Sequence, residues 1–143
     1  MSAPVPRDPD WRARTGASFA RQAVMAHLGV QVVEIAPGRV VLDLPFRADL
    51  TQHHGYLHAG ILTTVMDSAC GYAAFTLMAP GAEVLTVEFK TNFLAPAQGA
   101  VLRCTGEVVR SGRTLTICRG EALSDGRVIA AMQATLMAVP GDG

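Results

Sequence analysis

Residues 50–72 read LTQHHGYLHAGILTTVMDSACGY, and this segment sets the architecture of the chain. The apolar run continues from Ala59 to Leu77, and Asp67 is its only formal charge. A helix that is apolar on every side belongs in the interior of a protein. A run of this length is also a candidate membrane span. However, its hydroxyl residues and glycines, and the strand-like sequence around it, favour a buried helix in a soluble protein.

The flanking sequence alternates with the two-residue period of β-strands and is divided by turn signals such as Ser111-Gly112 and Asp125-Gly126. Runs of strands joined by hairpin turns indicate an antiparallel sheet. We therefore expect an α+β domain in which this sheet wraps around the central helix, in the order α-β-β-α-β-β-β-β. The expected elements are a short helix over 18–28, the helix over 59–77, and strands over 30–35, 40–44, 85–93, 101–109, 114–123 and 128–139.

The strand over residues 85–93 has a regular alternation that predicts its two faces. One face is expected to carry Leu85, Val87, Phe89, Thr91 and Phe93, and the other Thr86, Glu88, Lys90 and Asn92.

Composition excludes several classes of protein. The chain has 143 residues with a formal net charge of +0, and 50% of its residues are hydrophobic while 17% are charged. This excludes intrinsic disorder and argues against a general nucleic-acid binder. The low charged fraction also suggests that another subunit covers some apolar surface.

The organisation predicted from sequence is one domain over residues 16–140, after a flexible segment over residues 1–15. Residues 1–11 lack the apolar core of a signal peptide. Cys70, Cys104 and Cys118 have no paired spacing, which fits a reducing compartment. We therefore expect a cytoplasmic protein.

The start of the central helix is suited to bind a ligand oxygen. The first backbone N–H groups of a helix lack internal partners, and the helix dipole makes that end positive. A small residue at His58-Ala59-Gly60 lets a ligand oxygen approach these groups. Asp67 lies further along, on a face that it shares with Gly60, Thr64 and Gly71. A buried carboxylate on a stripe of small residues needs a partner, a water-filled site or a catalytic use.

At this point the sequence resembles the hot-dog-fold acyl-CoA thioesterases of the PaaI-like subfamily. That family's pattern is Asn or Gln, two residues, Gly, two residues, His-Gly-Gly, and an acid eight residues after the first of those glycines. Here the pattern reads Gln52, Gly55, His58-Ala59-Gly60 and Asp67. The segment TVEFKTNFLAP over residues 86–96 resembles the family's strand after the helix, so the resemblance covers nearly the whole domain.

The resemblance implies a role for each matching residue. Asp67 would be the catalytic carboxylate, as nucleophile or general base, and the N–H of Ala59 would bind the oxyanion. Gln52 would hold the attacking water or the substrate carbonyl from another subunit, Thr86 would position water, and His58 would orient the loop. Gly55, Gly60 and Thr64 would line the substrate site. Two departures, Ala59 in place of the first glycine and the extra pair His53-His54, bear on the substrate more than on the reaction.

The resemblance also implies an acyl-CoA substrate, no separate cofactor, no metal, and a homodimer or a dimer of dimers, that is, a homotetramer. From the net charge we expect no nucleic-acid partner, and from the polar residues of the central helix no membrane partner. Arg110 and Arg113 flank a hairpin and could meet the coenzyme A phosphates, because arginine pairs well with phosphate. We lean towards medium or long aliphatic acyl groups, and hence towards fatty acid metabolism.

Other interpretations stay open at this stage. His53, His54 and His58 with Asp67 could be read as metal ligands, although the spacing matches no metal motif. Cys70 could be a nucleophile, although a small buried hydrophobic role fits it better. A hot-dog enoyl-CoA hydratase or dehydratase, and a non-catalytic acyl-CoA-binding module, are the competing functions.

Overall fold

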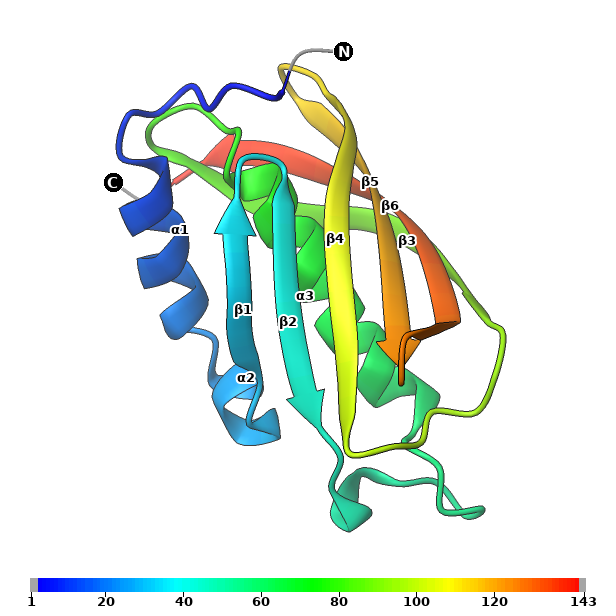
Figure 1. Cartoon of the computed structure of the whole chain (residues 1–143). Helices are drawn as coiled ribbons and strands as arrows, with labels where there is room; N and C mark the ends of the chain where they lie inside the picture. The colour runs from blue at the N-terminus through cyan, green and yellow to red at the C-terminus, as the bar shows by residue number, and fades with distance from the viewer. Residues whose placement is uncertain (1–2, 142–143) are drawn as a thin grey trace.

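The computed structural model describes residues 3–141 and contains a six-stranded sheet with the order β1-β2-β4-β5-β6-β3 (Figure 1). Every neighbouring pair of strands is antiparallel. The elements in chain order are α1 (Trp11–Ala20), α2 (Ala23–Leu28), β1 (Gln31–Ala36), β2 (Arg39–Pro45), a 3-10 turn (Ala48–Leu50), α3 (Ala59–Phe75), β3 (Ala82–Phe93), β4 (Val101–Ser111), β5 (Leu115–Ser124) and β6 (Arg127–Pro140). The predicted antiparallel sheet around a long central helix is confirmed.

The central helix α3 lies across one face of the curved sheet (Figure 1). Its second half is fully buried, from Ala69 to Phe75. The approach is close because Gly106 of β4 has no side chain: a Cβ there would lie 2.4 Å from the backbone carbonyl of Ala69. The sheet therefore holds the middle of α3 at a fixed distance.

The N-terminal region differs from the sequence prediction. Two helices, α1 and α2, replace the single helix predicted over 18–28, and α1 begins within the segment predicted to be flexible. Asp8 explains the earlier start, because its backbone and side-chain oxygens accept hydrogen bonds from the N–H groups of Trp11 and Asp10. The division into a segment over 1–15 and a domain over 16–140 stays a prediction.

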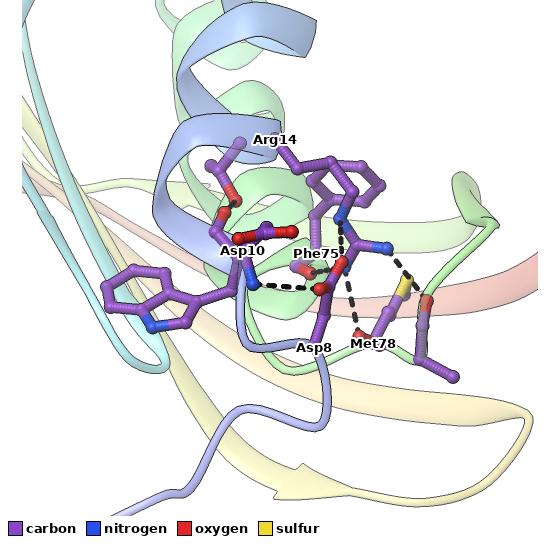
Figure 2. Close-up of polar contacts among 8 residues, drawn as sticks. Asp8, Asp10, Arg14, Phe75 and Met78 are labelled. Atoms are coloured by element: carbon purple, nitrogen blue, oxygen red, sulfur yellow. Dashed lines mark hydrogen bonds and ion pairs between the residues drawn. The ribbon is translucent and has the colours of Figure 1, made fainter.

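Arg14 ties α1 to the end of α3 (Figure 2). Its guanidinium donates to the carbonyl oxygens of Phe75, Met78 and Ala79, lies 4.5 Å over the Phe75 ring, and pairs with Asp8 at 3.2 Å. These are carbonyls that a helix C-terminus leaves without internal donors. A cation therefore neutralises the negative end of α3.

The predicted faces of the strand over 85–93 are wrong at its start. A β-bulge between Thr86 and Glu88 inserts Val87 as an extra residue, so the alternation shifts by one position. Thr86 is paired with Leu136 and Phe89 with Ala134, two buried residues of β6. Thr86 therefore shares the α3-facing side with Phe89, and not the outer side with Lys90.

β3 is also an edge strand, and it leaves apolar side chains exposed. Leu85, Val87, Phe89 and Phe93 are each between 45% and 59% accessible. A long apolar edge with unpaired backbone groups is a surface that pairs readily with another strand.

In the described part of the chain, no helix is long and apolar enough to cross a membrane.

Candidate active site

The start of α3 presents one free backbone donor. His58 is the N-cap, and its Nδ1 accepts a hydrogen bond of 2.9 Å from the N–H of Gly60. The imidazole lies over Gly60, where a Cβ would come within 3.2 Å of Nδ1. Among residues 3–141 the N–H of Ala59 has no acceptor, and Ala59 is exposed. The helix start therefore offers an unused donor at its positive end.

The loop before α3 is organised by Gln52. Its Oε1 accepts hydrogen bonds from the backbone N–H groups of His54, at 2.5 Å, and Tyr56, at 3.3 Å. Gly55 completes the turn with a φ of +82°, in the left-handed region that glycine adopts without strain. Within the described chain the Gln52 amide NH₂ has no acceptor. Gln52 thus holds the loop with one end of its amide and keeps the other available.

Asp67 and Thr86 form the second half of the site. The Thr86 hydroxyl donates a hydrogen bond of 2.8 Å to Asp67 Oδ1. The bulge at Val87 brings this hydroxyl to the helix side of β3. Burial raises the pKa of Asp67, and the hydrogen bond from Thr86 works against this rise. A carboxylate with a raised pKa and one hydroxyl partner is suited to accept a proton or to attack a carbonyl.

A hollow of about 410 Å³ opens beside the start of α3. It is lined by Gln52, Tyr56, Ala59, Leu62 and the end of β3 with the loop after it, from Phe93 to Ala97. The hollow has apolar walls and lies at the free Ala59 donor. Sequence reasoning did not identify Phe93 and Tyr56 as part of this site, because only the fold brings them together.

Asp67 and Ala59 do not meet within one chain. They are eight residues apart on one helix, which separates them by about 12 Å along its axis. A single carbonyl group cannot contact both the Asp67 carboxylate and the Ala59 N–H of the same copy. The candidate residues therefore fall into two groups at different positions along α3, named here the Ala59 half-site and the Asp67 half-site.

The remaining predicted substrate residues occupy different places. Thr64 lies between the two half-sites, but its hydroxyl donates back to the carbonyl of Gly60 at 2.9 Å. Ser68, which was not predicted, exchanges hydrogen bonds with Gln22 at the junction of α1 and α2. The contact could not be predicted from sequence, because a single glutamine between two short helices forms no recognisable motif.

Arg110 and Arg113 are not near the start of α3. Arg110 is exposed near the end of β4, and Arg113 lies in the β4–β5 hairpin, beside a hollow that Met78 and Pro80 also line. Residues 78–82, which line this hollow, follow the C-terminal end of α3, and Figure 1 shows the β4–β5 hairpin at the same end of the molecule. Within one chain the two arginines are thus at the opposite end of the helix from Gln52 and Ala59.

The Cys70 thiol is inaccessible, and the described residues contain no group of three or more His, Cys, Asp or Glu side chains that could hold a metal ion. Burial raises the pKa of the Cys70 thiol, with smaller contributions from Cys118 and Asp67. Cys70 is fully buried against the sheet, so it is not a ready nucleophile. His53 and His54 lie on the exposed loop with ring centroids 4.0 Å apart.

Comparison with known proteins identifies similar chains. Residues 54–131, more than half of the chain, match a family model described as thioesterase superfamily. A solved thioesterase family protein from Silicibacter pomeroyi is 55% identical with a TM-score of 0.88, covering 92% of this chain and 99% of that one. The Escherichia coli PaaI protein from the phenylacetic acid degradation operon has a TM-score of 0.85 at 19% identity, covering 92% of this chain and 95% of that one, and shows the likeness of fold.

Two curated relatives match shorter segments. A Saccharolobus solfataricus protein that carries the name of an esterase is 32% identical over 66% of this chain. This chain spans 66% of that relative's length, just under two thirds. A 1,4-dihydroxy-2-naphthoyl-CoA hydrolase from Listeria monocytogenes is 26% identical over 63% of this chain and 73% of its own length.

Proposed function

Because this chain belongs to the thioesterase superfamily, we propose that it hydrolyses an acyl-coenzyme A thioester, with Asp67 as the catalytic carboxylate. The predicted likeness to hot-dog thioesterases is confirmed. The observation that carries the proposal is the presence on α3 of two groups of complementary chemistry. One is the free Ala59 N–H at the positive end of α3, and the other is the half-buried Asp67 with its Thr86 hydroxyl.

In the proposed reaction the two groups act on one carbonyl. Ionised Asp67 takes a proton from water as the water oxygen adds to the thioester carbon, or adds itself and forms an anhydride that water then cleaves. In both routes the carbonyl oxygen becomes an oxyanion that the Ala59 N–H binds. Such a donor contributes about 3 kcal/mol in other enzymes. The oxyanion then collapses, the carbon–sulfur bond breaks, and the thiolate of coenzyme A leaves and takes up a proton; in the second route this step forms the Asp67 anhydride, which water cleaves afterwards.

A second copy of the chain supplies the missing half-site. Since one helix holds Asp67 and Ala59 about 12 Å apart, the Ala59 donor must come from a partner whose α3 runs in the opposite direction. A two-fold symmetric dimer provides this arrangement twice. Gln52 and the hollow next to Ala59 would then belong to the same half-site as the donor.

Pairing through β3 gives such a dimer. β3 is an edge strand with exposed apolar side chains, and Thr86 marks the Asp67 half-site while Phe93 marks the Ala59 half-site. To bring unlike half-sites together, residue 86 of one copy must lie near residue 93 of the other. The two β3 strands would therefore cross their symmetry axis close to Phe89. Assembly of two such dimers into a tetramer stays a prediction.

The substrate class rests on the site's shape and on the relatives. The hollow at Ala59 has mostly apolar walls and accommodates an extended thiol arm or an acyl chain. The Listeria relative's name gives it a coenzyme A thioester as substrate. We extend that class to this chain, with medium or long aliphatic acyl groups as the first to be tested, in line with a role in fatty acid metabolism.

The experiment is release of free thiol from a panel of short, medium, long and aromatic acyl-CoA substrates, run on the wild type and Asp67→Asn. We expect turnover of at least one substrate, and a loss of about 10²–10⁴-fold in Asp67→Asn, the range for removal of an acid–base group. Circular dichroism checks that the variant folds. Equal thiol release by both proteins would remove Asp67 from the mechanism, and no release from any substrate would reject thioester hydrolysis.

A further inference from the structure

We propose that Glu88 and Lys90 set the register in which two copies of the chain pair along β3, through two ion pairs that flank Phe89. In each ion pair, Glu88 of one copy lies opposite Lys90 of the other. This inference rests on the dimer of the proposed function and adds the charges that select one pairing of its strands. Association of the copies is measured without an activity assay, so the two proposals can fail separately.

Both charged side chains lie on the outer face of the edge strand. The neighbour of β3 within the chain is β6, where Glu88 is opposite Thr135 and Lys90 is opposite Gln133. Both charges are exposed, and over residues 3–141 neither forms an ion pair. β6 carries no acidic residue and no basic residue after its first position. A charged partner on a neighbouring strand can therefore come only from beyond the open edge of β3.

Lys90 also ends a row of alternating charges. The outer-face residues aligned across the sheet from β2 to β3 are Arg39, Glu107, Arg119, Gln133 and Lys90. Arg39 forms an ion pair with Glu107, and Arg119 is aligned with Glu107 on its other side. An acidic side chain opposite Lys90 continues this row into the second copy.

Two-fold symmetry permits only a few registers for the paired β3 strands. One residue lies opposite its own symmetry mate, and residues at equal distances on either side of it lie opposite one another. If the axis moves by one residue, the pairing shifts by two residues, and every side chain stays on its own face. The pattern of faces therefore does not distinguish an axis at residue 88, 89 or 90.

The charges distinguish these three registers. An axis at Glu88 places two glutamates opposite one another, and an axis at Lys90 places two lysines opposite one another. Both contacts are destabilising, because like charges directly across a strand pair repel. An axis at Phe89 instead gives two Glu88–Lys90 contacts, with Cβ atoms about 5 Å apart. The axis that the charges favour is thus the one that brings the unlike half-sites together.

Charge reversal tests this register. In Glu88→Lys every opposed pair at these positions is Lys–Lys, and in Lys90→Glu every opposed pair is Glu–Glu. We expect each variant alone to raise the dissociation constant of the dimer about tenfold or more at low salt, because two attractions become two repulsions. The measurement is sedimentation over a dilution series.

An equimolar mixture of the two variants separates repulsion from misfolding. Each heterodimer again has two Glu–Lys contacts, so native mass spectrometry should show heterodimers well above the fraction of about one half that random pairing gives. Glu34→Lys, on the opposite edge strand β1, is the matched control with the same change of charge. It should keep the wild-type dissociation constant.

The register is rejected by an unchanged dissociation constant in either variant, by the same loss in Glu34→Lys, or by random pairing in the mixture. A wild type that stays monomeric at every concentration rejects the register and the dimer together. A wild type that dimerises with the expected charge dependence but releases no thiol rejects the proposed hydrolysis and supports the register.

Discussion

Burial and the Thr86 hydroxyl have opposite effects on the pKa of Asp67. Burial raises the pKa of its carboxyl, because a low-dielectric surrounding disfavours the charged form. The Thr86 hydroxyl lowers the pKa, because it donates a hydrogen bond to the ionised oxygen. Burial is the larger of the two effects, so the pKa of Asp67 lies above its ordinary value. Hydrolysis that needs ionised Asp67 should lose rate on the acidic side at a higher pH than an exposed aspartate would give.

Replacing the hydroxyl by a methyl group tests this balance. In Thr86→Val the favourable hydrogen bond is lost and the burial remains, so the pKa of Asp67 rises further. We expect the acidic limb of the kcat/KM profile to move to higher pH. The measurement is the pH dependence of thiol release for both proteins. Thr116→Val, a buried position on β5, serves as the control and should keep the wild-type limb. A limb that stays in place or moves to lower pH in Thr86→Val would contradict the assigned contact.

At the scale of elements, the position of α3 depends on a glycine in the sheet. A Cβ at Gly106 would lie 2.4–2.5 Å from backbone atoms of Ala69 and Cys70, which is far inside normal contact. Because both sides of the contact are backbone, neither can rotate away. Gly106→Ala must push α3 off the sheet, and overpacking of this kind costs about 1–3 kcal/mol or more.

Urea denaturation measures that cost. Gly106→Ala should lower the free energy of unfolding, whereas Gly16→Ala in α1 should raise it by up to about 1 kcal/mol from helix propensity. The control is matched in chemistry, since a Cβ at Gly16 meets nothing within 4 Å. A Gly106→Ala protein as stable as the wild type would show that α3 does not rest on this strand as described.

The elements that the sequence predicts well are those with a strong periodic signal. The all-round apolar run predicts α3, and His58 before Ala59 marks its start. The bulge at Val87 carries no such signal, because a sequence that alternates through it looks like a regular strand. Because the bulge was not predicted, the alternation assigned Thr86 to the outer face of the strand. Only the family resemblance predicted a position for its hydroxyl near the site. The start of α1 was missed for a similar reason: it depends on the oxygens of Asp8, which accept hydrogen bonds from the N–H groups of Trp11 and Asp10.

At the scale of the whole molecule, the candidate site is incomplete in one chain. From a linear pattern the sequence predicts roles for Asp67, Ala59, Gln52 and Thr86, and the structure places these residues in two groups. A pattern gives spacing along the chain, but the rise of the helix separates its ends. The contact of Arg7 with the hairpin that carries Arg113 was missed for a related reason, because the two segments are distant in sequence and meet only in the fold.

The proposed dimer predicts that a charge at the middle of β3 separates the copies. Phe89 is 45% accessible in the single chain and would face its symmetry mate. Phe89→Glu places like charges opposite one another in a paired sheet, which is destabilising. We expect half the wild-type mass in sedimentation analysis, whether the wild type is a dimer or a dimer of dimers, with loss of thioester hydrolysis. Val5→Glu, at an 81% accessible residue of the segment before α1, should keep both mass and activity. An active, fully associated Phe89→Glu protein would reject this interface.

The central claim is that Asp67 of one copy and the Ala59 N–H of another act on the same thioester. Ala59→Pro removes this N–H, and proline suits the first position of a helix. His58 before it has a ψ of 134°, which proline tolerates in its neighbour. The variant thus deletes the donor and leaves the helix start in place.

The most direct measurement is complementation between Asp67→Asn and Ala59→Pro, coexpressed in equal amounts and assayed for thiol release. Each variant alone should be inactive or nearly so. In a mixed dimer one of the two sites has both wild-type groups, so random pairing in a symmetric dimer should restore about a quarter of the wild-type activity. If coexpression restores no activity although mixed dimers form, Asp67 and Ala59 do not act across two copies.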